Sequence, residues 1–138
     1  MKIGFTGTRQ GMTEAQAATF KEIIYSLNVA EFHHGDCIGA DMDAHNIVSG
    51  YCDIIIHPPI NPKYRAFCKA NKLLSEKEYK IRNCDIINNS DIVIGIPCKE
   101  YEVIRSGTWH ALRYARKIKK PIIIIWPAGN IEKINFDK

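Results

Sequence analysis

The chain has 138 residues, of which 46% are hydrophobic and 25% charged, and its net charge at pH 7 is +4. A chain of this length buries roughly two-thirds of the surface that its unfolded form exposes, so we expect one domain spanning residues 1–138. No apolar run approaches the roughly 20 residues that cross a bilayer, and the first apolar stretch is too short for a secretory signal. The sequence therefore predicts a cytoplasmic protein without membrane contact, and its mild positive charge favours small anionic ligands.

The predicted elements alternate between strands and helices from the N-terminus. Residues 2–6 form the first strand, and Thr13 with Gln16 forms a capping-box pattern that begins the first helix. Residues 31–34 form a short second strand, residues 39–50 a second helix, and residues 52–59 a third strand that two prolines stop. Each strand of this half is thus followed by a turn that contains glycine or proline.

The second half begins with an irregular segment, residues 61–76, for which we expect a short helix and a loop. Residues 78–90 form a helix and residues 91–97 a fourth strand. After a polar loop, the last helix begins near Ser106 and leads to a fifth strand, residues 121–127. The tail after Pro127 is weakly patterned.

The third and fifth strands contain unbroken β-branched runs, which suit strands covered on both faces. Together with the alternation of strands and helices, they predict an α/β fold, a Rossmann-like doubly wound parallel sheet of five strands in the order 3-2-1-4-5, flanked by helices. Ligands in such sheets bind outside the carboxyl ends of the strands, at the crevice where the strand order reverses. Here that crevice lies between the first and fourth strands.

Glycine and polar residues follow three strands at this edge. Gly7, Thr8 and Arg9 follow the first strand, and Arg9 offers a planar fork that matches phosphate. Before the last helix come the residues Arg105, Ser106, Gly107 and Thr108, whose free amides would hold an anion. Alternatively, Ser106 or Thr108 is only a helix cap, and Arg9 forms a surface ion pair.

The second strand ends in a polar turn with five candidate ligand contacts, His34, Gly35, Asp36, Gly39 and Asp41. Asp36 lies where Rossmann-type proteins place an acid on ribose hydroxyls. Asp41 alternatively serves its helix only as an acidic first-turn residue. His33 and His34 point to opposite faces of a strand and so chelate poorly together; we expect no metal and no cofactor.

Four stretches, "GFTGTR", "HHGDCIGAD", "IRNCDIINNSDIVIGIP" and "RSGTWHALRYARKIKKPIIII", resemble the successive signatures of the SLOG superfamily over residues 1–127. This group includes the Lonely-guy-type proteins, the DNA-processing protein A domain, and small stand-alone bacterial and phage proteins. The resemblance implies a Rossmann-like fold, a nucleotide-derived ligand, and a homodimer or homotetramer. It also implies that Arg82 and Asn83, before the fourth strand, contact the ligand or a second subunit.

Lonely-guy proteins cleave the N-glycosidic bond of nucleoside monophosphates with a glutamate of their PGGxGTxxE motif. Aligning Gly107 and Thr108 with that Gly-Thr pair places Ala111 at the glutamate position. The resemblance therefore supplies no catalytic acid, and the remaining candidates near the edge are Asp36, Asp41 and Glu100. Tyr101 is the candidate for stacking on a base, because Trp109 continues an apolar stripe that suits a core or an interface.

Three functions remain. The favoured one is a protein that binds a nucleoside phosphate, cyclic nucleotide or ADP-ribose-like signal at the ends of the first, second and fourth strands, as a sensor or a sequestering protein. The second is a hydrolase that cleaves an N-glycosidic or phosphodiester bond with a relocated acid. The third and least favoured is single-stranded nucleic-acid binding through basic residues along and after the last helix, Arg113, Arg116, Lys117, Lys119 and Lys120.

Overall fold

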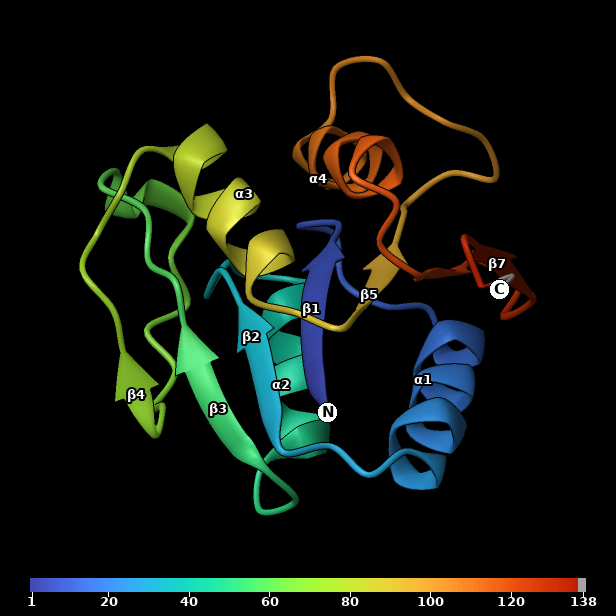
Figure 1. The fold of residues 1–138 in the computed structure, drawn as a ribbon, viewed down its shortest axis with the longest axis horizontal. Coiled ribbons are helices and arrows are strands. Elements are labelled where there is room, and N and C mark those ends of the chain that lie inside the picture. The colour runs from blue at the N-terminus through green and yellow to red at the C-terminus, as the bar shows by residue number, and fades with distance from the viewer. Residues whose placement is uncertain (137–138) are drawn as a thin grey trace.

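The computed structural model describes residues 1–136, which form a mostly parallel sheet between two layers of helices (Figure 1). The elements of its N-terminal half are β1 (Lys2–Gly7), α1 (Glu14–Ser26), β2 (Glu31–His34), α2 (Ala40–Val48), β3 (Asp53–Ile56) and the 3-10 helix η1 (Pro62–Tyr64). The C-terminal half contains β4 (Lys72–Leu73), α3 (Tyr79–Asn88), β5 (Ile92–Ile96), α4 (Gly107–Lys117), β6 (Ile122–Ile125) and β7 (Ile131–Ile134).

The sheet has the order β4-β3-β2-β1-β5-β6-β7 within the described residues. Its central five strands, β3, β2, β1, β5 and β6, are parallel and follow the predicted order 3-2-1-4-5. The predicted class and the order of the central strands are therefore confirmed, but the predicted number of five strands is wrong. A two-residue parallel strand, β4, and an antiparallel strand, β7, extend the two edges.

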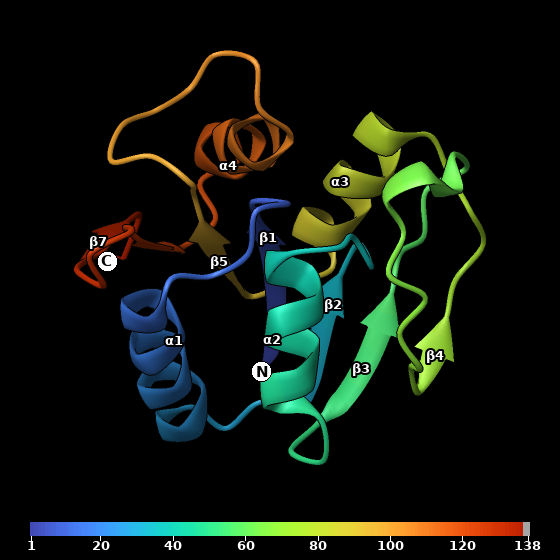
Figure 2. The same ribbon diagram turned by 180° about the vertical axis from the view of Figure 1, so that it is seen from behind.

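Each face of the sheet has its own apolar core. Phe20 of α1 and Ala44 of α2 pack with Phe5 and Phe32 on one face, whereas Leu112 of α4 packs with Val93 on the other. Figure 2 shows α1 and α2 in front of the sheet, and Figure 1 shows α3 and α4 on the opposite side. The four isoleucines of β6 alternate between the two cores, which explains why that strand is an unbroken apolar run.

The predicted capping box of the first helix is confirmed. The Thr13 hydroxyl accepts a hydrogen bond from the Gln16 amide at 2.9 Å, and the Gln16 side chain accepts one from the Thr13 amide at 2.9 Å. The Gln16 side-chain amide also donates to the carbonyls of Pro97 and Ile125, at 2.9 and 3.0 Å. One buried glutamine thus begins α1 and fixes it to the carboxyl ends of β5 and β6.

The parallel strands all end at one edge, at the top of Figure 1. The turn after β1, the turn after β2, η1 and the long loop before α4 meet there. No helix within residues 1–136 is long and apolar enough to cross a membrane.

Candidate functional site

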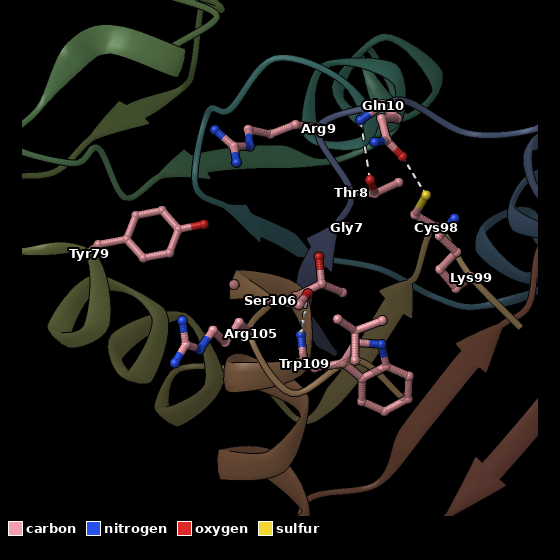
Figure 3. A pocket seen from close by; sticks show the side chains of 13 residues that line it. Gly7, Thr8, Arg9, Gln10, Tyr79, Cys98, Lys99, Arg105, Ser106 and Trp109 are labelled. Atoms are coloured by element: carbon pink, nitrogen blue, oxygen red, sulfur yellow. Dashed lines mark hydrogen bonds between the residues drawn. The ribbon is translucent and has the colours of Figure 1, made fainter. Parts of the chain in front are cut away.

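A cavity of about 290 Å³ lies between the end of β1 and the start of α4. It contains the residues that the sequence predicted from these two turns, and we call it the basic cavity. Its lining is Gly7, Thr8, Arg9, Gln10, Tyr79, Cys98, Lys99, Val103, Arg105, Ser106, Gly107, Thr108 and Trp109. Figure 3 shows how the labelled side chains among them surround the space.

The start of α4 presents backbone amides to this cavity. Ser106 is the residue that caps the helix, and its hydroxyl accepts a hydrogen bond from the Trp109 amide at 3.3 Å. The amides of Gly107 and Thr108 precede the first hydrogen bonds inside the helix and have no acceptor within residues 1–136, so they are available to a ligand. Ser106 therefore does serve as a cap, and the same cap orients the amides and the positive end of the helix toward the cavity.

Three basic side chains line the basic cavity, those of Arg9, Lys99 and Arg105, and none of the described lining residues is acidic. None of the three forms a salt bridge with a carboxylate within residues 1–136. Arg9 is therefore not held by the surface ion pair that was its alternative role. Its guanidinium instead lies over the ring of Tyr64, 3.9 Å from the ring centroid.

The turn that carries Arg9 depends on Gly39 for its shape. The Thr8 carbonyl accepts hydrogen bonds from the amides of Gly11 at 3.2 Å and Ala40 at 2.9 Å, which join the turn to the start of α2. Gly39 has a φ of +91°, and a Cβ added to it would collide with the backbone of Arg9. Gly39 thus packs against the backbone of Arg9 and holds the turn in place, but it does not itself line the cavity.

A second, wider hollow of about 920 Å³ adjoins the basic cavity and shares Arg9, Tyr79 and Gly107 with it. We call it the aromatic groove. Its other lining residues are Cys37, Pro59, Ile60, Asn61, Tyr64, Glu78 and Lys80. Since three residues belong to both linings, the two hollows form one continuous surface over the carboxyl edge of the sheet.

Asp36 lies beneath η1 and lines neither hollow. It is fully buried and has a φ of 59°. Its carboxylate accepts hydrogen bonds from Arg65 Nε at 2.8 Å and from the Cys68 amide at 3.0 Å, and its carbonyl accepts one from the Ala66 amide at 2.7 Å. The structure thus uses Asp36 to hold the segment after η1, and this segment directly follows Tyr64, which lines the aromatic groove.

His34 is buried on the α2 side of the sheet and also lies outside both hollows. Its Nδ1 accepts a hydrogen bond from the Asp36 amide at 2.9 Å, so the Nε2–H donates to His45 Nδ1 at 3.0 Å. Burial, followed by the neighbouring His45, lowers the pKa of His34 to about 3. The buried Gly35 carbonyl is likewise occupied, because it accepts a hydrogen bond from Arg82.

Asp41, Arg82 and Asn83 surround a small chamber of about 10 Å³ beneath Tyr79, enough for roughly one water molecule. Asp41 Oδ2 accepts a hydrogen bond from the Cys37 amide at 3.1 Å, and burial raises the pKa of Asp41 to about 6. The side-chain oxygen Oδ1 of Asn83 accepts a hydrogen bond from Arg82 Nε at 2.9 Å, while Asn83 Nδ2 has no partner among the described residues. These three predicted residues are brought together, but they are buried and line neither the basic cavity nor the aromatic groove.

Glu100 and Tyr101 lie on the exposed loop between β5 and α4, and neither lines the basic cavity or the aromatic groove. The structure therefore does not bring them to the other candidates. Three residues that sequence reasoning missed, Lys99, Tyr64 and Tyr79, do line these hollows. Lys99 lies two residues after the predicted fourth strand and could have been found by that position. In contrast, nothing in the sequence relates Tyr64 and Tyr79 to each other.

No group of three or more histidine, cysteine, aspartate or glutamate side chains within residues 1–136 is arranged to hold a metal ion. The neighbouring His33 and His34 point to opposite faces, as expected from a strand. His33 contacts His57 at 2.8 Å and Glu31 at 2.9 Å, whereas His34 contacts His45.

No family model and no curated protein matches the chain. Two solved structures are similar in fold. A molybdenum cofactor binding protein from the phototrophic bacterium Rippkaea orientalis superimposes with a TM-score of 0.68 and 21% identity, over 91% of this chain and 76% of that one. The X-ray structure of the structural genomics target TM1055 superimposes with a TM-score of 0.63 and 12% identity, over 88% of this chain and 71% of that one. At these identities, the similarity shows a Rossmann-like fold.

Proposed function

We propose that the protein binds a nucleotide-derived small molecule at the carboxyl edge of its sheet, with a phosphate group in the basic cavity. The observation that carries this proposal is that Arg9, Lys99 and Arg105 line one cavity, which has no acidic residue in its lining among residues 1–136. Unpaired cations beside the free amides of a helix N-terminus favour an anion with several oxygens, and phosphate is the common biological example. Membership of the SLOG superfamily, which the four sequence signatures suggest, is part of the same proposal.

Binding without cleavage, by a sensor or sequestering protein, is the favoured form of this function. Asp36 is occupied by Arg65, and Glu100 lies outside both hollows, so neither carboxylate reaches a ligand in the basic cavity. The fold neighbour from Rippkaea orientalis, described as a cofactor binding protein, supports a ligand-binding role for this architecture.

A nucleotide hydrolase is the second candidate, and the raised pKa of Asp41 favours it. A carboxyl group whose pKa is raised to about 6 suits proton transfer near neutral pH. Its chamber adjoins Gly7 and Tyr79, which also line the basic cavity. Asp41 is buried and lines neither hollow, so a ligand would reach this carboxyl group only after a local rearrangement.

Nucleic-acid binding has less support, because part of the predicted basic stripe is already occupied. Arg113 and Arg116 pair with Glu102 at 2.9 and 3.3 Å, and the Lys120 ammonium donates to the Ser90 carbonyl at 2.5 Å. These contacts reduce the number of cations that remain for a phosphate backbone.

The binding function predicts that Arg9→Ala abolishes nucleotide binding and leaves the fold intact. Arg9 is exposed and contributes a stack on Tyr64, so its loss should cost less than about 1 kcal/mol of unfolding free energy. Isothermal titration with nucleoside monophosphates and cyclic dinucleotides, beside a thermal melt, measures both effects. Arg116→Ala, which removes an exposed arginine on the far end of α4, is the matched control and should bind as the parent does.

Chromatography of the incubated nucleotides separates the two candidate functions. Intact ligand recovered after denaturation supports binding, whereas free base or a cleaved phosphodiester supports the hydrolase. Normal nucleotide binding by Arg9→Ala would show that the phosphate does not sit in the basic cavity.

A further inference from the structure

Tyr79, the first residue of α3, stands between the basic cavity and the aromatic groove and lines both. Its side chain approaches Gly107 so closely that a Cβ at that position would collide with the tyrosine hydroxyl. Figure 3 shows the phenol with its hydroxyl directed toward the centre of the cavity, between Arg9 and Arg105. The residue is nevertheless 47% exposed, so much of its ring is free to meet a ligand.

One face of the Tyr79 ring is already covered. The guanidinium of Arg82 lies over it, with Cζ 4.6 Å from the ring centroid. Arg82 is only 2% exposed, and its Nη1 donates to the carbonyls of Gly35 at 2.7 Å and His57 at 3.1 Å. Because Arg82 is buried and fixed by backbone acceptors, it closes that face of the Tyr79 ring, and the rest of the ring borders the basic cavity and the aromatic groove.

The far wall of the groove is also flat and aromatic. The ring of Tyr64 carries the guanidinium of Arg9 at 3.9 Å, and Pro59 and Ile60 continue the apolar surface. This wall has a fixed position, because the Ile38 amide donates to the Tyr64 carbonyl at 2.8 Å and Asp36 holds the segment that follows. The lining of the groove therefore contains two aromatic rings, those of Tyr79 and Tyr64, together with the apolar side chains of Pro59 and Ile60.

We propose that the aromatic groove binds the base of the nucleotide, stacked on the free face of Tyr79, while the phosphate occupies the basic cavity. The proposal rests on the proposed function and adds a binding site for the base, for which the basic cavity does not account. Arg9, Tyr79 and Gly107 belong to both hollows, so one ligand with an anionic end and a flat aromatic end contacts both. Stacking between a base and an aromatic side chain accepts any base, so the groove selects for a base without selecting which one.

The test uses adenosine monophosphate and ribose 5-phosphate, two probes that share the phosphate and the ribose and differ in the base. Titration of the full chain with each probe should show that Tyr79→Leu weakens binding of adenosine monophosphate by about 10- to 100-fold. Binding of ribose 5-phosphate should change by less than about threefold, because it makes no stack. Tyr79→Phe keeps the ring and should restore the affinity for adenosine monophosphate.

Two further variants make the comparison specific. Tyr51→Leu removes another exposed tyrosine, 64% exposed and stacked on Tyr25 before β3, and should leave both affinities unchanged. Tyr101→Leu tests the rival stacking residue, and a loss of adenosine monophosphate binding there, with none in Tyr79→Leu, would overturn the proposal. Equal losses of both probes in Tyr79→Leu would overturn it as well, since Tyr79 would then act on the phosphate.

The two proposals fail in different ways. If the unchanged protein binds ribose 5-phosphate as tightly as adenosine monophosphate, the basic cavity stands and the base site is wrong. If it binds neither probe, the proposed function is wrong and the base site falls with it. A thermal melt of each variant confirms that the compared chains are folded.

Discussion

At the scale of single residues, burial separates the candidate side chains that are open to a ligand from those that hold the fold together. Arg9, Lys99 and Arg105 are exposed and unpaired within residues 1–136. In contrast, His34 and Asp36 are fully buried and have their hydrogen-bonding atoms occupied. An exposed cation without a partner costs the folded state little free energy, because water solvates it. A buried acid or histidine without a partner would cost about several kcal/mol, so the buried groups have partners.

Asp41 predicts a pH dependence of stability. Burial raises its pKa from 3.8 to about 6, so between these values the folded state holds a proton that the unfolded state has lost. Its contribution to stability is complete below about pH 4 and is lost as the pH rises through 6, by about 3 kcal/mol in total. Asp41→Asn should remove this loss, since the amide oxygen still accepts from Cys37.

Urea unfolding of the parent and Asp41→Asn from pH 4 to pH 7 measures this effect. The difference in unfolding free energy should shift in favour of the variant as the pH rises. The buried His34 and His57, whose pKa values burial lowers to about 3 and about 4, act in the opposite direction, since they destabilise the fold as the pH falls below their unfolded value. They are present in both chains and cancel in the difference, so a pH-independent difference would contradict the role given to Asp41.

At the scale of elements, the connections between strands and helices carry most of the residues that line the candidate site, and the helices and strands support them. The Arg9 turn is fixed by its hydrogen bonds to Ala40 and by the close approach of Gly39. The segment from η1 to Cys68 is fixed by Asp36. The turns that follow β1 and β2 therefore support the site in different ways: the first carries Arg9, and the second anchors the segment that follows Tyr64.

Loss of the Asp36 anchor should release the segment that carries Tyr64. Asp36→Ala leaves the largely buried Arg65 without its partner and places alanine at a positive φ, so we expect a loss of about 3–5 kcal/mol of unfolding free energy. Limited trypsin digestion should cut the variant faster at Lys63 and Arg65 under conditions where it remains folded. Asp36→Asn, which tolerates this φ and keeps an acceptor for the Cys68 amide, should be cut more slowly than Asp36→Ala.

At the scale of the whole molecule, β7 covers an edge that would otherwise be exposed. It pairs with β6 from Ile122 to Ile125 in antiparallel register, and the turn before it is held by Thr19, whose hydroxyl donates to the Gly129 carbonyl at 2.8 Å. Without β7, the unpaired edge of an isoleucine strand would face solvent, which favours pairing with another chain.

A chain that ends at Ala128 should therefore self-associate beyond the state of the full chain. Size-exclusion chromatography with light scattering at several concentrations measures this change. The double variant Glu132→Ala and Lys133→Ala alters two exposed residues of β7 while keeping its backbone, and should behave as the full chain does. An unchanged mass after truncation would show that β7 does not protect the edge.

Much of the fold could be predicted because its signals are local. The capping box of Thr13 and Gln16, the isoleucine run of β6 and the Ser106 cap each depend on neighbouring residues in the sequence. The strands β4 and β7 were not predicted, because they carry no such local signal. Lys72 and Leu73 are exposed and become a strand only by pairing with Ile55 and Ile56, and the burial of β7 shows no alternation.

The sequence by itself determined the α/β class, the order of the central strands, and the meeting of the Arg9 turn with the start of α4, because parallel strands bring their carboxyl ends to one edge. Only the tertiary structure decided the environment of each polar side chain at that edge. Burial and pairing depend on residues distant in the chain, such as Asp36 with Arg65 and Tyr79 with Gly107. These long-range contacts assigned His34 and Asp36 to the fold, and they brought Tyr64 and Tyr79, which no local pattern marks, to the candidate site.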